Sequence, residues 1–379
     1  MATTDPVAAL AEATRQMNEE TKRILDYEQN WIDKQAFLQS RGYMLRARYR
    51  PGWRPSWEQD PTLDPFSCDD FWRLPYFPSI TDATRIADGR LVCIKRVTTD
   101  GQELLIANYF STGPLREDPK NHCVPVIDSF RDEETPEDSY IVMPFMRNMD
   151  DPPFELVTDV LEFADEVLEG IAFMHAHGVA HRDPAPSNIL MDADSMYPKG
   201  YHPVFKTYLP NFRTRAWPYS RFSAPAGVRY YLADFGISAR FAAGQQRLVS
   251  GEIGADREVP ELHSGAPYDP FKVDIFVLGN VFKKRIHDKY FRVGFFAPLI
   301  TAMMQHNPQN RPDATEALAM WQKIRRRVLL TQRLCRLQGR DEALVQTVVL
   351  DIASVIKVAY VLAKRFAGWS LRWLLLLIS

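Results

Sequence analysis

Two short segments carry the side chains best suited to chemistry in this chain. Residues 181–188 read His-Arg-Asp-Pro-Ala-Pro-Ser-Asn, and residues 234–236 read Asp-Phe-Gly. Phosphoryl transfer needs little covalent help from a protein, because one carboxylate that orients the acceptor hydroxyl and a few ligands for Mg²⁺ supply most of the chemistry. The acidic and amide side chains of the two segments are of the types that this chemistry uses.

The residues around these segments predict the elements that position them. An apolar pattern with helical spacing covers 167–180, and Gly178 is a plausible end of that helix. The short apolar runs 188–191 and 230–233 predict two strands, and the second strand leads directly into Asp234.

Further segments stand in a fixed order along the chain. Residues 82–97 predict a hairpin with an Asp-Gly turn, and its second strand, Val-Cys-Ile-Lys, ends at Lys95. After Asp234 follow Val-Pro-Glu at 259–261, an apolar helix that contains Asp274, and the segment 307–312, which reads Asn-Pro-Gln-Asn-Arg-Pro.

Together these segments resemble the landmarks of the protein kinase family, in family order over residues 80–325. The resemblance implies an α+β class, two-lobed protein-kinase-like fold, with a β-rich N-lobe over 73–146 and a helical C-lobe over 147–328. Four further segments resemble protein-kinase-like proteins of basidiomycete fungi, namely 46–57, 82–85, 118–125 and 196–203.

The resemblance also implies roles for single residues, with ATP and Mg²⁺ as cofactors. Asp183 would be the catalytic base, and Asn188 and Asp234 would hold the metal. Lys95 would bind the α- and β-phosphates, and Glu103, the only Glu on the next predicted helix, would orient Lys95. The implied function is transfer of the γ-phosphate to Ser or Thr hydroxyls of protein substrates.

Other residues would bind the adenine or stabilise the catalytic loop. Met143 stands at the gatekeeper position, Pro144 offers its carbonyl to the adenine, and Met146 offers both its N–H and its carbonyl. The resemblance gives Asp274 a structural role, as a brace of the catalytic-loop backbone. It also pairs Arg311 with Glu261.

Two departures from the family pattern keep a second function open. The segment 73–86, where a Gly-rich loop would cover the phosphates, has no glycine, and Ala185 stands where Ser/Thr kinases place a Lys. A pseudokinase scaffold, which binds partners without efficient catalysis, is therefore the alternative. A small-molecule kinase is disfavoured, because such enzymes usually lack the Asp-Phe-Gly and Pro-Glu landmarks.

The sequence predicts a chain of three parts. Residues 1–72 hold an N-terminal helix over 7–28 and a strap rich in Arg, Pro and aromatic residues, and residues 73–328 form the kinase-like domain. An insertion at 197–228, rich in aromatic residues, is expected to be an ordered flap against the C-lobe. Residues 329–379 form a helical tail.

The tail combines apolar length with a few charges. Asp351 and Lys357 interrupt the apolar run, so no stretch reaches the roughly 20 uncharged residues that span a bilayer. Thr347, Asp351, Ser354 and Lys357 leave a broad apolar face on the rest of the helix. Such a helix could lie on a membrane surface as a peripheral contact, or pack against the C-lobe or the N-terminal helix.

Composition sets the remaining limits. The 46 basic and 48 acidic residues nearly cancel, so no long-range field favours nucleic acid as a partner. The four cysteines form no metal-binding spacing, which indicates a reducing, intracellular and cytoplasmic setting.

Arg182 is of the type that receives an activation-loop phosphate in related kinases. Ser250 is the best acceptor for such a phosphate, although the preferred interpretation is that Ser250 is an ordinary loop serine.

Overall fold

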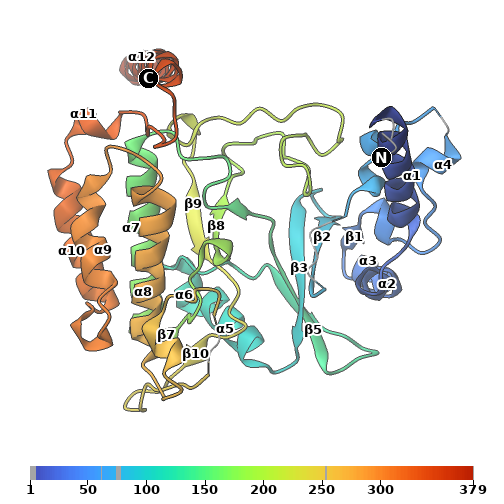
Figure 1. The fold of residues 1–379 in the computed structure, drawn as a ribbon, viewed down its shortest axis with the longest axis horizontal. Coiled ribbons are helices and arrows are strands. Elements are labelled where there is room, and N and C mark those ends of the chain that lie inside the picture. The colour runs from blue at the N-terminus through green and yellow to red at the C-terminus, as the bar shows by residue number, and fades with distance from the viewer. Residues whose placement is uncertain (1–5, 61, 74–77, 252–253, 379) are drawn as a thin grey trace, which may run out of the picture. The chain divides into compact units, whose positions relative to one another are not determined.

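The computed structural model of the chain contains two compact units (Figure 1). The first comprises Met1–Gly101, Val126–Phe145 and Tyr197–Pro218, and the second comprises Gln102–Pro125, Met146–Met196 and Tyr219–Ser379. The structure describes residues 6–60, 62–73, 78–251 and 254–378. The three-part division expected from the sequence follows different boundaries and stays a prediction.

A five-stranded antiparallel sheet organises the first unit, in the order β1-β2-β3-β5-β4. Its strands are β1 Tyr43–Leu45, β2 Ile80–Arg85, β3 Leu91–Thr98, β4 Asp128–Arg131 and β5 Asp138–Pro144. The predicted hairpin is confirmed, because β2 pairs with β3 and Gly89 adopts a φ of 72° in the turn between them. Such a left-handed conformation favours glycine.

Two of the three N-terminal helices of this unit contribute to a core against the sheet. The three helices are α1 Pro6–Lys22, α2 Asp26–Asp33 and α3 Gln35–Ser40. Trp31 of α2 and Leu38 of α3 are buried in one cluster with Ile94 of β3 and Val142 of β5. The helix expected over 7–28 is thus two helices, since α1 ends at Lys22 and α2 begins at Asp26.

The connection from β1 to β2 is long and partly folded. It contains η1 Ala47–Tyr49, α4 Ser56–Gln59, η2 Pro65–Ser67 and η3 Asp69–Phe71. The rings of this strap pack with one another, with Trp57 and Phe71 buried at the centre of the cluster. Two of its arginines are neutralised inside the unit, because Arg48 pairs with the fully buried Glu28 at 2.5 Å and Arg46 pairs with Asp82 at 2.9 Å.

The insertion is divided between the two units. Its residues 197–218 belong to the first unit and its residues 219–228 to the second, where Arg221 donates to backbone carbonyls within residues 149–153. The expected packing of residues 197–218 against the C-lobe stays a prediction. The Nε2 atom of His202 lies 2.6 Å from a carboxylate oxygen of Asp69, and the ring of Phe205 packs edge-on against Trp72. The strap supplies the ring that packs against the insertion, and it supplies the carboxylate that pairs with His202.

The second unit is mainly helical, with two small sheets. Its helices are α5 Gln102–Ser111, α6 Gly113–Glu117, α7 Val157–Ala176, α8 Pro270–Phe282, α9 Ala297–Met303, α10 Ala314–Arg327, α11 Leu330–Arg333 and α12 Leu344–Ile378. Its strands are β6 Arg147–Asn148, β7 Val179–Ala180, β8 Ile189–Asp192, β9 Arg229–Leu232 and β10 Ala239–Arg240. Short helical turns complete it, namely η4 Pro186–Asn188, η5 Arg221–Ser223, η6 Pro260–His263, η7 Lys283–His287, η8 Gly294–Phe296 and η9 Pro308–Asn310.

The long helix α7 lies at the centre of this unit because it is apolar on several sides. Leu161, Phe163 and Leu168 are fully buried, and α10 packs along α7 through Trp321, whose indole N–H donates to Asp165 at 2.7 Å. The strand β9 also lies against α7, and β8 pairs with β9 (Figure 1). These two strands flank the catalytic loop and the Asp-Phe-Gly segment in the sequence.

Candidate active site

The end of α7 fixes the start of the catalytic loop. The helix ends at Ala176, and Gly178 adopts a φ of 73°, which confirms it as the residue that ends the helix. A Cβ atom at Gly178 would lie 2.5 Å from the carbonyl oxygen of Phe241, so this approach also requires glycine. The strand β7 follows and pairs with β10, which brings the chain after Asp-Phe-Gly beside the catalytic loop.

Asp274 of α8 holds the backbone of the catalytic loop. Its two carboxylate oxygens accept hydrogen bonds from the backbone N–H groups of His181 at 2.8 Å and Arg182 at 2.6 Å, and one of them also lies 2.8 Å from His175 Nε2. Asp274 is fully buried, and Arg182 is held at a φ of 69°. The predicted structural role of Asp274 is confirmed.

The substitution Asp274→Asn should therefore destabilise the protein. An Asn has one oxygen where three donors converge, and its NH₂ group would face a backbone N–H, which leaves buried donors without acceptors. We expect the free energy of unfolding to fall by about 1–3 kcal/mol in urea denaturation. Asp341→Asn, at an exposed position of the same unit, is the matched control. An unchanged urea midpoint in Asp274→Asn would contradict the bracing role.

His181 links the catalytic loop to the residue before Asp234. Its Nδ1 accepts a hydrogen bond from the backbone N–H of Asp183 at 3.4 Å, so its Nε2 carries the proton and donates to the carbonyl of Ala233 at 3.0 Å. Burial lowers the pKa of His181, which keeps the ring neutral. A neutral ring in this tautomer makes both bonds at once.

Asp183 lies in a small network of donors. The side-chain amide of Asn188 donates to its carboxylate at 3.0 Å and to its backbone carbonyl at 2.9 Å. The backbone N–H of Ala255 donates to the other carboxylate oxygen at 2.9 Å. Burial raises the pKa of Asp183, and the charge of Asp234 raises it further, whereas the bonds from Ala255 and Asn188 oppose the shift.

The Asp-Phe-Gly segment brings Asp234 and Glu103 to the same glycine. Asp234 has a φ of 65°, and its carboxylate accepts from the N–H of Gly236 at 3.2 Å. A Cβ atom on Gly236 would lie 3.1 Å from Asp234 Oδ1 and 3.4 Å from Glu103 Oε2. Phe235 is buried and contacts the ring of Phe110 on α5, which anchors the helix that carries Glu103.

The other site residues predicted from the sequence lie mostly in the first unit. Lys95 is in the middle of β3, paired with Ile80 and Ile141 on the two neighbouring strands. Met143 and Pro144 end β5. Glu103, Asp183, Asn188, Asp234 and Met146 belong to the second unit, so the Lys95–Glu103 pair and the adenine contacts stay predictions.

The position of β1 was missed by the analysis of the sequence. The strand that pairs with β2 is Tyr43–Leu45, so residues 46–79 connect the two strands, whereas the family pattern places a Gly-rich hairpin within 73–86. The available signal was the apolar triplet Tyr-Met-Leu directly after Gly42, but three residues are too few for a periodicity.

The segment after Asp-Phe-Gly holds Arg182 and contains Ser250. Arg182 donates to the carbonyl of Ile237 at 3.0 Å and to the hydroxyl of Tyr268 at 3.2 Å. Ser250 is exposed on the loop between them. Recognition of a phosphate by Arg182 stays a prediction.

Glu261 and Arg311 form two parallel hydrogen bonds of 2.6 and 2.8 Å, which confirms the predicted pair.

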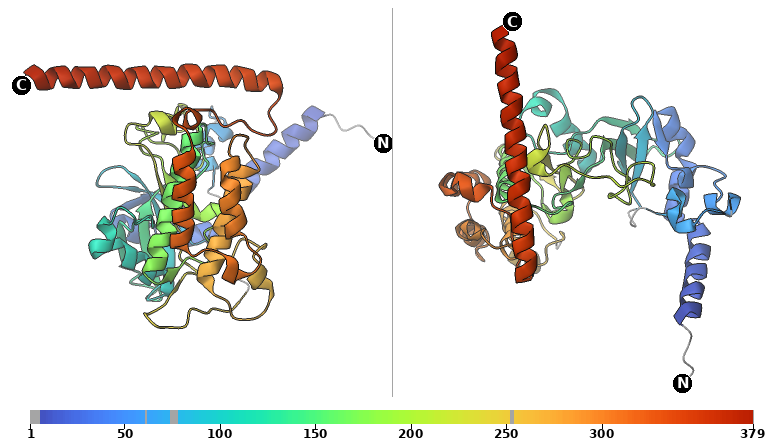
Figure 2. Two further views of the ribbon diagram at one scale, coloured as in Figure 1. Left: turned by 90° about the vertical axis from the view of Figure 1, so that its left-hand side faces the viewer. Right: turned by 90° about the horizontal axis from the view of Figure 1, so that it is seen from above.

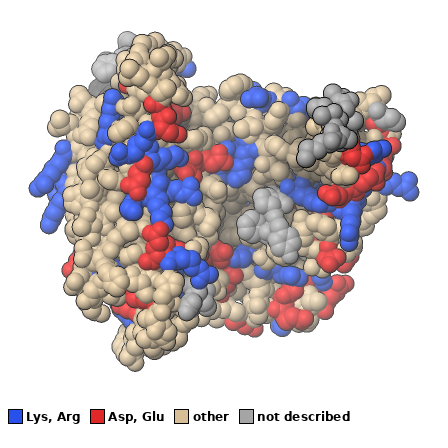
Figure 3. Space-filling view, viewed as in Figure 1, with Lys and Arg blue, Asp and Glu red and all other residues tan. Residues whose placement is uncertain are grey.

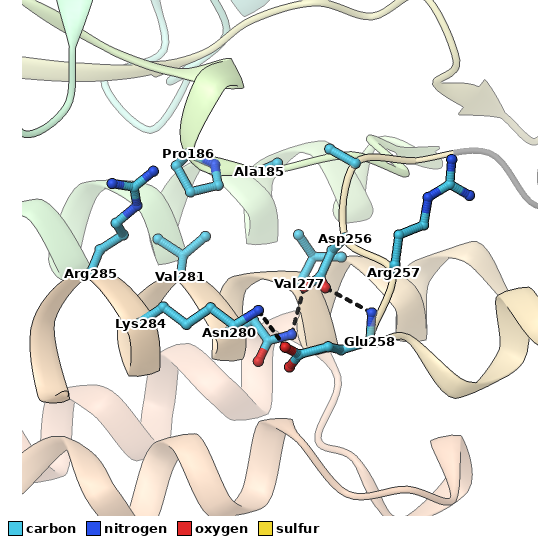
Figure 4. Close-up of a pocket in the computed structure, with 11 residues that line it drawn as sticks. Ala185, Pro186, Asp256, Arg257, Glu258, Val277, Asn280, Val281, Lys284 and Arg285 are labelled. Carbon is cyan, nitrogen blue, oxygen red and sulfur yellow. Dashed lines mark hydrogen bonds and ion pairs between the residues drawn. The ribbon is translucent and has the colours of Figure 1, made fainter. Parts of the chain in front are cut away.

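A pocket opens beside the catalytic loop (Figure 4). It has a volume of about 520 Å³, with an apolar floor from α8 and a charged rim. On the rim, Glu258 pairs with Lys284 at 2.7 Å and Asp256 accepts from the amide of Asn280 at 2.6 Å. The lining residues are Ala185, Pro186, Ala255, Asp256, Arg257, Glu258, Val277, Asn280, Val281, Lys284 and Arg285. Since Ala255 also donates to Asp183, the pocket adjoins the carboxylate expected to act as base.

The sequence of the chain is similar to those of known proteins. Residues 77–291 match the family model described as protein kinase domain. The chain is 28% identical over 164 residues to the serine/threonine-protein kinase chk1 of Schizosaccharomyces pombe, which covers 41% of this chain and 26% of that protein. It is 29% identical over 133 residues to the probable serine/threonine-protein kinase KKQ8 of Candida glabrata, covering 34% of this chain and 13% of that protein.

These alignments cover at most about a quarter of the relatives' own length. The match of the family model to residues 77–291 spans more than half of the chain. The fold predicted from the sequence is confirmed, with an antiparallel sheet in the N-terminal part, a helical C-terminal part, and helical extensions at both ends.

Proposed function

Because the chain belongs to the protein kinase family, we propose that it transfers the γ-phosphate of ATP to Ser or Thr hydroxyls of protein substrates, with Mg²⁺. The observation that carries this proposal is the position of Asp183. Its carboxylate is oriented by Asn188 and Ala255, lies beside an open pocket, and feels the charge of Asp234. The two relatives named above are a serine/threonine-protein kinase and a probable serine/threonine-protein kinase, which favours the same acceptor class here.

Asp183 has the environment that a base for a hydroxyl group needs. Both of its carboxylate oxygens accept one hydrogen bond, and each carboxylate oxygen has further lone pairs for the acceptor hydroxyl. Asn188 keeps the carboxylate in one orientation, so the hydroxyl would meet it in a reactive geometry. A proton accepted by Asp183 would leave the hydroxyl oxygen free to attack phosphorus.

Asn188 and Asp234 fit a magnesium site that is completed by phosphate oxygens. The amide NH₂ of Asn188 is used on Asp183, so its side-chain oxygen can face a metal, and it accepts only from Ser187 at 3.2 Å. Among the described residues, no group of three or more His, Cys, Asp or Glu is placed to hold a metal alone. Mg²⁺ commonly uses one or two carboxylates together with waters and phosphates, and it neutralises the developing charge on the phosphates.

The remaining roles rest on the family resemblance. Lys95 would bind the α- and β-phosphates and Glu103 would orient it, while Met143, Pro144 and Met146 would bind the adenine. The pocket beside Ala255 would take the acceptor segment of the protein substrate. A cytoplasmic setting and a place among the basidiomycete kinase-like proteins remain part of the proposal.

The second candidate is a pseudokinase, and it has its own supporting observations. Ala185 is buried in an apolar cluster with Val259 and Val277, so packing has replaced the Lys of Ser/Thr kinases. The strap between β1 and β2 replaces a Gly-rich hairpin. A missing positive charge near the transferred phosphate would slow the reaction by about 10²-fold if nothing replaces it.

Thermal-shift titration with ATP separates the two functions. We expect ATP to raise the melting temperature of the full chain only when Mg²⁺ is present, and Asp234→Asn to abolish the shift. Transfer of labelled γ-phosphate to the chain itself or to an added Ser/Thr protein then reports catalysis. A magnesium-dependent shift without transfer would identify the nucleotide-binding scaffold, and the absence of both signals would overturn the kinase mechanism.

The raised pKa of Asp183 predicts how the rate of phosphoryl transfer falls at acidic pH. A base must be ionised, so its activity is lost as the pH falls through its pKa. Since burial raises the pKa of Asp183 above the usual 3.8 of an aspartate, the rate should start to fall at a higher pH than for an exposed aspartate. The test is a pH profile of kcat/KM, with ATP binding measured in the same buffers. A rate that stays constant down to pH 4 would contradict the assignment.

A further inference from the structure

The C-terminal helix α12 docks on the second unit through its less apolar side. Thr347, Asp351, Ser354, Val358 and Val361 are the partly or fully covered positions, at spacings of four, three, four and three residues. This spacing places all five on one stripe of the helix. Three of the five side chains are polar, so the docking of α12 does not use its apolar face.

Polar bonds hold this stripe on the unit. The carboxylate of Asp351 accepts from Arg336 at 2.7 Å, and Lys357, at the edge of the stripe, pairs with Glu155 at 2.6 Å. Arg365 donates to the carbonyl of Phe222 at 2.6 Å. These bonds are spread over almost four turns, so they fix which side of α12 faces away from the unit.

The side that faces away is almost purely aliphatic. Val345, Ile352 and Val355 are 77%, 57% and 68% exposed, and their spacing covers a broad arc of the helix. The other strongly exposed members of this arc are Leu344, Val348, Val349, Ile356 and Tyr360. In Figure 3 the atoms at the place of α12 are mostly uncharged, and Figure 2 shows its C-terminal end projecting past the other helices of the unit.

The composition of α12 favours lipid over protein as the cover of this arc. Protein interfaces are enriched in aromatic residues, Met and Arg, whereas the strongly exposed positions of this arc are Leu, Val and Ile, with Tyr360 as the one aromatic residue among those named. The segment Leu344–Arg365 has a mean hydropathy of 1.8 and is apolar and long enough to cross a membrane by length and composition. Asp351 and Lys357 would have to give up their partners to cross, which favours a helix lying in the interface.

The charged residues of α12 indicate which kind of membrane the helix would bind. Up to Arg365 the helix carries three basic residues, Lys357, Lys364 and Arg365, against the single acid Asp351, although the whole chain has a net charge of −2. Basic residues beside an apolar helix face are typical of helices at the headgroup level of anionic membranes. We propose that α12 is a docked amphipathic helix whose aliphatic arc inserts into the surface of an anionic phospholipid bilayer.

Flotation of the full chain with vesicles tests this proposal, independently of any kinase activity. We expect the protein to float with vesicles of phosphatidylcholine and phosphatidylserine, and far less with phosphatidylcholine alone. The double substitution Ile352→Gln with Ile356→Gln should reduce the bound fraction by about tenfold or more, because it removes two aliphatic anchors from the arc. Ile86→Gln is the matched control, since Ile86 is 53% exposed but lies outside α12.

Three results would overturn the proposal. One is an absence of flotation with both kinds of vesicle, and the second is equal flotation with both kinds. The third is a dimer in sedimentation velocity that the double substitution dissociates while vesicles bind neither protein, since a second copy of the chain would then cover the arc. Unchanged thermal unfolding of the double variant shows that a loss of flotation is not a loss of folding.

Discussion

Asp183→Asn should abolish most of the phosphoryl transfer while the protein keeps its fold and its affinity for magnesium and ATP. The substitution preserves the shape of the side chain, and its oxygen can still accept from Asn188 or Ala255. It removes the basic oxygen that would accept the proton of the hydroxyl. Removal of a positioned base typically costs 10²–10⁴ in rate, so we expect kcat to fall by about 10³-fold.

The measurement combines transfer of labelled phosphate with the thermal-shift titration. For Asp183→Asn we expect a normal magnesium-dependent ATP shift and a much lower kcat, whereas Asp234→Asn should lose the shift itself. Asp341→Asn, at an exposed position of the same unit, should change neither quantity. A kcat of Asp183→Asn within a few-fold of the unchanged protein would exclude Asp183 as the base.

The local parts of this site were predictable from the sequence. Asp183 and Asn188 lie within one short loop, and Asp274 and the Glu261–Arg311 pair follow from motifs whose residue types leave few alternatives. The structure confirms the contacts of Asp274 with the loop backbone and of Arg311 with Glu261, because short loops between buried strands and helices restrict where such side chains can lie. Motif order was sufficient for these residues. The roles of Asp183 and Asn188 stay predictions.

The parts that depend on distant pairing were not predictable. The strand β1 has three residues, and it is defined by pairing with β2, which begins at Ile80. Residues 197–218 of the insertion are held in the first unit by the contact of His202 with Asp69, two residues 133 positions apart. Neither contact leaves a periodicity in the sequence, because each depends on a single partner far along the chain.

For Ala185 the sequence predicted the missing charge but not the packing of the side chain. The sequence identified it as a missing charge, which is a statement about catalysis. The structure adds that its methyl group is buried among apolar side chains of η6 and α8. A substitution Ala185→Lys would therefore have to place a charge in an apolar cluster, so it could not be used simply to restore the charge of other kinases.

The second large effect that we expect concerns the buried pair of Arg311 and Glu261. The side chain of Arg311 is fully buried, and besides Glu261 it donates to the carbonyls of Gln305, Lys272 and His306. One guanidinium thus joins the loop before α10, the start of α8 and the helical turn η6. Removing one partner of such a pair leaves a buried charge without compensation, which typically costs 3–5 kcal/mol.

Arg311→Met should accordingly lower the free energy of unfolding by about 3–5 kcal/mol in urea denaturation, because Glu261 and three carbonyls lose their donor. Glu261→Gln should cost less than Arg311→Met, since Gln can still accept one hydrogen bond. Lys284→Met, which breaks a half-exposed pair with Glu258, should change stability by less than about 1 kcal/mol. If Arg311→Met lowered the free energy of unfolding as little as Lys284→Met, the pair would not be what holds the three segments together. The double variant with Glu261→Gln would then measure the coupling free energy of the two residues. A coupling free energy near zero would assign any loss of stability in Arg311→Met to the carbonyl contacts.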